Sequence, residues 1–138
     1  MISLILGHKG SGKTKRLISC VNEAIEQSKG NVICVEEKTK LTYDVDHRAR
    51  LISANDYRVA GFASFYGFLA GICASDHDIT DVLIDATLKI GGRDYAALAV
   101  FLENVYNLSE EQEKNFIFTV SADKEELPES IFNFCKVI

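Results

Sequence analysis

Residues 7–14 read Gly7-His8-Lys9-Gly10-Ser11-Gly12-Lys13-Thr14 and match the pattern G-x-x-x-x-G-K-[ST] at every fixed position. The glycines allow backbone conformations that other residues avoid, so that successive N–H groups turn inward and bind an anion. A helix that begins directly after the loop adds its unpaired N–H groups and its dipole to the same field. The stretch therefore predicts a cradle for the phosphates of a nucleotide, with the Lys13 ammonium on the β- and γ-phosphates and the Thr14 hydroxyl on Mg²⁺.

The residues on either side of this loop supply the strand and the helix that such a cradle needs. Residues 2–6 form a short apolar run that is typical of a buried strand. A glycine-rich turn that binds nothing is the alternative, and the order strand, loop, helix disfavours it. We expect the nucleotide to contact every residue from Gly7 to Thr14 and also Lys15. Apolar residues recur at helical spacing after the loop, up to about Gly30: Leu17, Ile18, Val21, Ala24 and Ile25.

Strands and helices alternate along the rest of the chain. A helix is expected from Asn55 or Asp56 through Cys73, another after Gly91-Gly92, and a short one at Pro128. This alternation predicts a single α/β domain over residues 1–138, a three-layer α/β/α sandwich with a mostly parallel sheet of about five strands. Apolar runs predict the further strands at 31–35, 81–85 and 116–120, with 51–53 and 136–138 as shorter candidates.

Three segments are less regular. Residues 41–53 are interpreted as a hairpin that turns at Asp46-His47, and residues 107–115 as a solvated connection. The glycines of the helix ending near Cys73 are expected to permit close packing against the sheet.

Composition narrows the class of protein. The chain has 138 residues, 47% of them hydrophobic and 25% charged, with a formal net charge of −5. This acidic balance argues against a large nucleic-acid surface, which needs clustered Lys and Arg. The longest apolar stretch, 59–74, contains glycines and is too short to span a bilayer comfortably, and we expect no signal peptide because the first strand begins at once. We therefore expect a cytoplasmic protein without a membrane partner.

The cysteines lie in apolar segments and show no C-x-x-C spacing. This pattern favours buried, reduced thiols over a disulfide framework or a zinc site. The four positions are Cys20, Cys34, Cys73 and Cys135.

The chain resembles the P-loop NTPase superfamily in two stretches. Its phosphate loop matches the Walker A motif, and the apolar run Asp81-Val82-Leu83-Ile84-Asp85 is similar to the Walker B motif. The resemblance implies that Asp85 is the carboxylate on the Mg²⁺ shell and that Lys13 and Asp85 serve catalysis. Many hydrolysing members carry a Glu directly after this Asp, whereas here Ala86 and Thr87 follow. The resemblance leaves open whether Thr87, Asp78, Asp81 or a Glu of the pair 36–37 orients the attacking water.

The order of the motifs is similar to that of the superfamily's additional-strand class, on its recombinase and secretion-ATPase side. There, the strand after Asp85 often ends in a polar residue that senses the γ-phosphate, which makes Thr119 and Ser121 candidates, although Ser and Thr at strand ends also cap helices. Further positive charge for a transferring phosphoryl group could come from Lys38, Lys89 or Arg93.

Two other assignments are disfavoured. A GTPase of the regulatory type is disfavoured because the guanine-reading N-K-x-D motif is absent. An ATPase of the chromosome-partitioning type is disfavoured because it would have a lysine where His8 stands. The short core is also similar to thymidine kinases and corrinoid adenosyltransferases, and to small bacterial proteins labelled twitching-motility ATPases, although the acidic and histidine boxes of those motors have no counterpart here.

Three functions remain open at this point. The first is ATP binding with Mg²⁺ and slow hydrolysis, together with a protein partner or as a homo-oligomer. The second is a small-molecule kinase or nucleotidyl transferase whose acceptor loop spans 38–50, with Tyr43, Asp44, His47 and Arg48. The third is a non-catalytic nucleotide sensor or assembly subunit.

Overall fold

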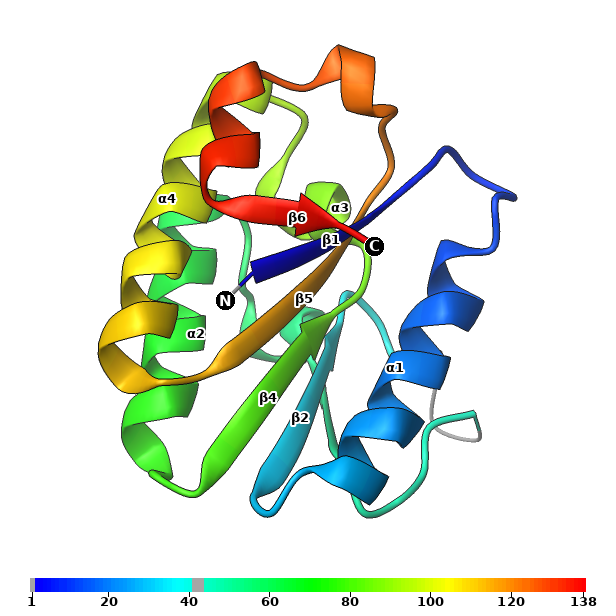
Figure 1. The fold of residues 1–138 in the computed structure, drawn as a ribbon, viewed down its shortest axis with the longest axis vertical. Helices are drawn as coiled ribbons and strands as arrows, with labels where there is room; N and C mark the ends of the chain where they lie inside the picture. The colour runs from blue at the N-terminus through cyan, green and yellow to red at the C-terminus, as the bar shows by residue number, and fades with distance from the viewer. Residues whose placement is uncertain (1, 41–43) are drawn as a thin grey trace.

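A parallel sheet runs through the centre of the molecule (Figure 1). The computed structural model describes residues 2–40 and 44–138. In this part of the chain the sheet has six strands in the order β3-β2-β4-β5-β1-β6, and every pairing is parallel. The strands are β1 (Ile2–Leu6), β2 (Asn31–Glu36), β3 (Arg50–Ser53), β4 (Ile79–Ile84), β5 (Asn115–Val120) and β6 (Cys135–Val137).

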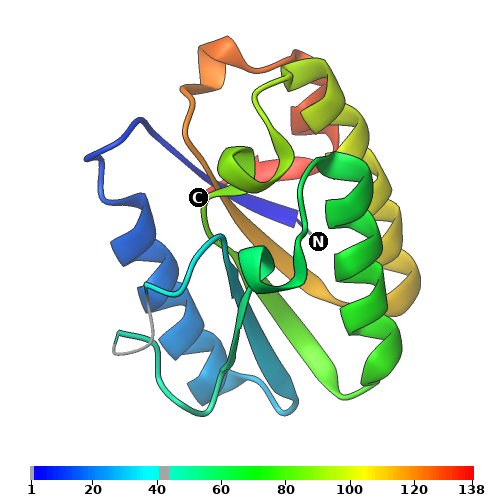
Figure 2. The same ribbon diagram turned by 180° about the vertical axis from the view of Figure 1, so that it is seen from behind.

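Helices cover both faces of this sheet. One face carries α1 (Lys13–Gln27), and the other carries α2 (Phe62–Ser75) and α4 (Tyr95–Gln112), which lie side by side in both views (Figures 1 and 2). A five-residue helix, α3 (Thr87–Gly91), follows β4. Single-turn 3₁₀ helices lie at η1 (Ala54–Tyr57), η2 (Lys124–Glu126) and η3 (Glu129–Asn133).

The alternation of side chains along the buried strands builds two cores. In β2, Ile33 and Val35 pack toward α2 and α4, whereas Val32 and Cys34 pack toward α1. This is the pattern that a strand covered on both faces requires. The larger core includes an aromatic cluster in which the ring centroids of Phe65 and Phe101 are 4.9 Å apart.

The predicted three-layer α/β/α architecture is confirmed, and the count of about five strands is corrected to six. Both short candidates join the sheet, since β3 pairs with β2 and β6 pairs with β1. They stand at the two ends of the strand order and are therefore the two edges of one sheet.

The helix expected from Asn55 or Asp56 begins later than predicted. Residues 54–57 form only a 3₁₀ turn, which ends at Arg58 in a left-handed conformation (φ 58°). The helix α2 begins after Gly61, whose φ of 88° suits glycine. The expected cap was therefore wrong, because the left-handed Arg58 ends the 3₁₀ turn and a new helix starts only after Gly61.

The predicted solvated connection at 107–115 was also wrong, because α4 continues to Gln112 and β5 begins at Asn115. Its polar residues occupy the outer face of the helix, while the Ser109 hydroxyl is buried and donates to the Lys114 carbonyl at 2.6 Å. The helix begins at Asp94, whose carboxylate accepts hydrogen bonds from the N–H groups of Ala96 and Ala97. The helix thus follows Gly91-Gly92 as predicted, and these two glycines also close the short α3, which sequence periodicity missed.

The hairpin interpretation of residues 41–53 is only partly testable. Residues 41–43 lie outside the described residues, while Asp44 and Val45 are not in a strand. A turn does form at the expected place, where the Ala49 N–H donates to the Asp46 carbonyl. The strand after the turn, β3, pairs in parallel with β2. A hairpin would instead pair it in antiparallel with the residues just before the turn.

Two further expectations concern membrane-spanning helices and the burial of the cysteines. No helix among the described residues is long and apolar enough to cross a membrane. Cys34, Cys73 and Cys135 are buried as expected, and Cys20 is half-buried.

Candidate functional site

A cavity of about 830 Å³ lies at the carboxyl ends of the sheet strands, between the loop after β1 and the segments that follow β2 and β4. We call it the crevice. In open α/β sheets, ligands commonly bind in a crevice outside the carboxyl ends of the strands. The residues of the predicted loop that line the crevice are His8, Lys9, Gly10, Gly12, Lys13, Thr14 and Lys15.

The loop after β1 has the backbone that its glycines predict. Gly10 and Gly12 take φ values of 88° and 85°, a region that costs other residues energy. Gly12 is also the residue from which α1 begins, so the first N–H groups of the helix face the loop. The Lys13 ammonium folds back onto the loop and donates to the His8 carbonyl at 3.2 Å.

The carboxylate of Asp85 is held by two hydroxyl groups from other elements. Thr14 Oγ1 lies 3.3 and 3.2 Å from its two oxygens and donates to them. Thr119 Oγ1 donates to Asp85 Oδ1 at 2.7 Å and accepts the Ala86 N–H at 2.9 Å. Ala86 itself has a left-handed backbone (φ 57°), so the chain turns sharply just after the carboxylate. The crevice therefore unites Thr14, Asp85 and Thr119, which are far apart in sequence.

The crevice is rich in positive charge although the chain is acidic. Among the described residues, the acidic groups around it are Glu36, Glu37, Asp44 and Asp85, and basic residues outnumber them. Partial burial lowers the pKa of Lys13, while the nearby Asp85 acts to raise that pKa and Lys89 acts to lower it. Low-dielectric walls strengthen the field of such a cluster toward an anion. The basic residues are Lys9, Lys13, Lys15, Lys38, Lys40, Lys89 and Arg93.

The structure separates the candidates for a water-orienting group. Thr87 is fully buried, and Asp78 and Asp81 lie at the start of β4, at the opposite end of the strand from Asp85. Glu36 ends β2, the strand beside β4, and it lines the crevice together with Glu37. The Glu36 side chain is almost fully buried, and its Oε1 accepts the Lys40 N–H at 2.6 Å.

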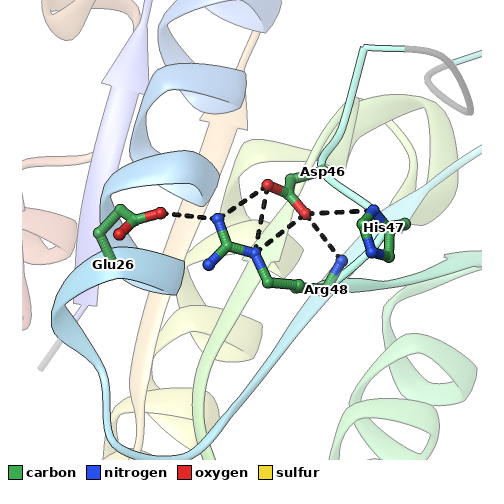
Figure 3. Close-up of polar contacts among 4 residues, drawn as sticks. All are labelled: Glu26, Asp46, His47 and Arg48. Atoms are coloured by element: carbon green, nitrogen blue, oxygen red, sulfur yellow. Dashed lines mark hydrogen bonds and ion pairs between the residues drawn. The ribbon is translucent and has the colours of Figure 1, made fainter.

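The proposed acceptor loop contributes only in part. Lys38, Lys40 and Asp44 line the crevice, but Arg48 does not. The Arg48 guanidinium instead donates to Asp46 and to Glu26 of α1, and Asp46 also lies beside His47 (Figure 3). His47 and Arg48 therefore do not line the crevice as an acceptor loop would require, and Tyr43 lies outside the described residues.

One contact to the phosphate loop has no signal in the sequence. His8 Nε2 lies 2.6 Å from Glu126 Oε1 and 3.3 Å from Asp123 Oδ2, both on the segment after β5. Because β5 is the neighbour of β1, the two segments leave the sheet side by side. Only the order of strands brings His8 to these carboxylates.

The donor set of the crevice fits a hard divalent cation. The Thr14 hydroxyl and the Asp85 carboxylate are oxygen donors, which Mg²⁺ prefers, and they already lie in contact. The comparisons with known proteins add no family: no protein-family model matches the chain, and the search of curated proteins finds no match.

Proposed function

We propose that the crevice binds a nucleoside triphosphate with Mg²⁺ and that the protein belongs to the ATP-binding P-loop NTPases. The observation that carries this proposal is the direct contact between Thr14 and Asp85, one from the glycine-rich loop and one from the end of β4. Asp85 lies 71 residues after Thr14 in the chain, so local sequence does not account for the contact between its carboxylate and the Thr14 hydroxyl. Their meeting joins an oxygen-donor pair to a loop whose amides can bind phosphates.

The order of the strands supports the additional-strand class. Between the strand of the phosphate loop, β1, and the strand of Asp85, β4, lies one further strand, β5. Thr119 stands on this strand and contacts Asp85, which suits a group that responds to the γ-phosphate. Lys13 would hold the phosphates, and Thr14 and Asp85 would hold Mg²⁺. The bound Mg²⁺ would neutralise charge on the phosphate oxygens.

For the hydrolytic step we propose Glu36 as the base. Water attacks the γ-phosphorus, the bond from that phosphorus to the bridging oxygen of ADP breaks, and the water proton passes to the Glu36 carboxylate. Glu36 is favoured because it ends the strand next to β4, whose following residue is Asp85. Both carboxylates lie close enough to Cys34 to act on its thiol, since burial, Glu36 and Asp85 together raise the pKa of Cys34 to about 12. No Glu stands directly after Asp85, so we expect turnover to be slow.

Calorimetry with ATP and Mg²⁺ tests the binding site. Lys13→Ala should weaken ATP binding by roughly tenfold to 100-fold, because a charged hydrogen-bond donor to the phosphates is lost. The control is Lys29→Ala, which removes a lysine just beyond the other end of α1. Equal ATP affinity in wild type and Lys13→Ala would refute the nucleotide site.

Phosphate release separates the remaining functions. Glu36→Gln should keep ATP affinity and lower hydrolysis by about 100-fold or more, whereas Glu37→Gln serves as the matched control. Hydrolysis that is unchanged in Glu36→Gln would rule out this base. Binding without release by the wild type would favour the sensor.

A phosphotransferase is the second candidate, and one observation favours it. The crevice continues from the phosphate loop to Lys38, Lys40 and Asp44, which leaves room for an acceptor opposite the phosphates. Consumption of ATP that requires an added acceptor, with no free phosphate formed, would support this function over hydrolysis.

A further inference from the structure

A second cavity, of about 590 Å³, lies between α2 and the β2–β3 edge of the sheet. We call it the edge cavity. It shares no lining residue with the crevice, and its strand residues include Asn31 and Ile79, which begin β2 and β4. It therefore reaches the amino ends of β2 and β4, whereas the phosphate loop lies at the carboxyl ends of the sheet strands. Its volume is in the range of small-molecule sites. Its apolar lining includes Ile33, Ile52, Tyr57, Phe68 and Ile72.

The wall on the side of α2 is partly bare backbone. Gly67 and Gly71 line the cavity, and a Cβ atom added to either would meet no heavy atom within 4 Å. The expectation that these glycines permit close packing on the sheet is therefore wrong. They leave space, and a planar group can lie flat against the helix there.

An aromatic pair stands at this cavity. Tyr57 is 64% exposed, unusually open for so large a ring, and its centroid is 6.2 Å from that of Phe68 at an angle of 31°. Both rings line the cavity. A further planar ring can add to such a pair by offset stacking.

The edge cavity offers one arginine, Arg50, that can bind an anion. Arg48 is already paired with Asp46 and Glu26, and Asp76 accepts a hydrogen bond from the Asn31 amide at 2.8 Å. Arg50, on the edge strand β3, also lines the cavity, and its guanidinium has no hydrogen-bond or ion-pair partner among the described residues. A guanidinium in this state is suited to bind a carboxylate in a bidentate manner.

We propose that the edge cavity is a second ligand site, separate from the crevice, for a planar aromatic acid whose ring lies against Gly67 and Gly71 of α2 and stacks on the Tyr57–Phe68 pair, and whose carboxylate is bound by Arg50. The proposal does not depend on nucleotide binding, because the two cavities share no residue. It explains why two glycines stand in the interior of a helix that does not need them for packing.

Two fluorescent probes of matched shape test the charge. The chain has no tryptophan, so naphthalene emission can be followed directly. Naphthalene-2-carboxylate should bind saturably to the wild type, and Arg50→Gln should weaken this binding by about tenfold. Naphthalene-2-methanol, which lacks the charge, should bind equally to both proteins. The control variant is Lys136→Gln, on the opposite edge strand.

Filling the cavity tests its place. Gly71→Leu, with its fold checked by circular dichroism, should abolish the binding of both probes, and Gly71→Ala should weaken it less. Lys13→Ala should leave probe binding unchanged. The proposal is overturned if the wild type does not bind the carboxylate saturably, if Gly71→Leu binds it normally, if Arg50→Gln affects both probes equally, or if Lys13→Ala abolishes binding.

Discussion

At the scale of single residues, the crevice depends on a carboxylate that two threonines hold in place. Thr14 and Thr119 donate to Asp85 from α1 and β5, and Thr119 also accepts the N–H that follows Asp85. Each threonine thus restricts the rotamer of a charged group that would otherwise be free at a strand end. This pre-positions oxygen donors before any ligand arrives, which lowers the ordering cost of binding.

A second carboxylate, Asp46, gives a prediction for pH dependence. Hydrogen bonds from the Arg48 side chain and backbone lower the pKa of Asp46 to about 2. The pKa of Asp46 in the folded protein lies below the ordinary value near 3.8. The ionised Asp46 therefore contributes fully to the free energy of unfolding above about pH 4, and this contribution is lost as the pH falls toward 2. In Arg48→Gln the pKa of Asp46 should return toward its ordinary value.

Carbon-detected nuclear magnetic resonance of the Asp46 carboxyl group measures this shift directly. Arg58→Gln is the control, since the groups that lower the pKa of Asp46 are Arg48 and His47 (Figure 3). The same pKa for Asp46 in wild type and Arg48→Gln would contradict the assigned cause. Denaturation of both proteins at pH 7 and at pH 2 gives a second measurement. The free energies of unfolding of wild type and Arg48→Gln should differ less at pH 2 than at pH 7.

At the scale of elements, helix α2 shows how similar glycines take different roles. Gly61 begins the helix with a positive φ, whereas Gly67 and Gly71 stand inside it and face open space. Gly91 of α3 is different again, because a Cβ there would overlap the ring of Phe62. Sequence alone cannot separate these cases, since the reason lies in neighbours from other elements.

These roles predict opposite effects on stability. Gly67→Ala and Gly71→Ala should each raise the free energy of unfolding by about 0.5–1 kcal/mol, because alanine favours the helix and meets no obstacle. Gly91→Ala should lower it, because Phe62 must move. Guanidinium denaturation followed by circular dichroism measures all three variants. Destabilisation by both α2 substitutions would show that the helix needs its glycines for packing.

At the scale of the whole molecule, the order of strands decides which segments meet. The placement of β5 beside β1 brings Thr119 to the phosphate loop and Glu126 to His8. The placement of β2 beside β4 brings Glu36 near Asp85. Only one end of a parallel sheet gathers these loops, so the crevice is a product of topology.

The burial of the thiols in this sheet predicts a labelling pattern. Burial is the main reason that the pKa values of Cys34 and Cys135 are raised to about 12, and burial also raises the pKa of Cys73 and of Cys20. The thiolate is the reactive form and must also be reached by the reagent. Because Cys20 is only half-buried and the other three thiols are buried, an aromatic disulfide reagent at pH 8 should label Cys20 first and the others only as the protein unfolds. Cys20→Ser should remove the fast phase. Rapid labelling of all four thiols in the folded wild type would contradict the sheet packing.

Much of the fold was predictable because local periodicity carries it. The apolar runs at 31–35 and 116–120 lie in strands, and the spacing of Leu17 and Val21 gives the buried side of α1. The start of α2 was missed because the left-handed conformation of Arg58 is not visible in its residue type. The end of α4 was missed because the polar residues of its exposed face resemble those of a loop. The short α3 failed because five residues hold too little periodicity.

By itself, the sequence determined the α/β class, the parallel sheet and the position of a glycine-rich loop between a strand and a helix, because these follow from residue spacing within short windows. Only the tertiary structure decided that Thr14 and Thr119 meet Asp85, that Glu36 rather than Asp78 or Asp81 reaches the crevice, and that α2 leaves a cavity at the sheet edge. These contacts join residues far apart in the chain, and they depend on strand order and on packing between elements, which no local pattern records.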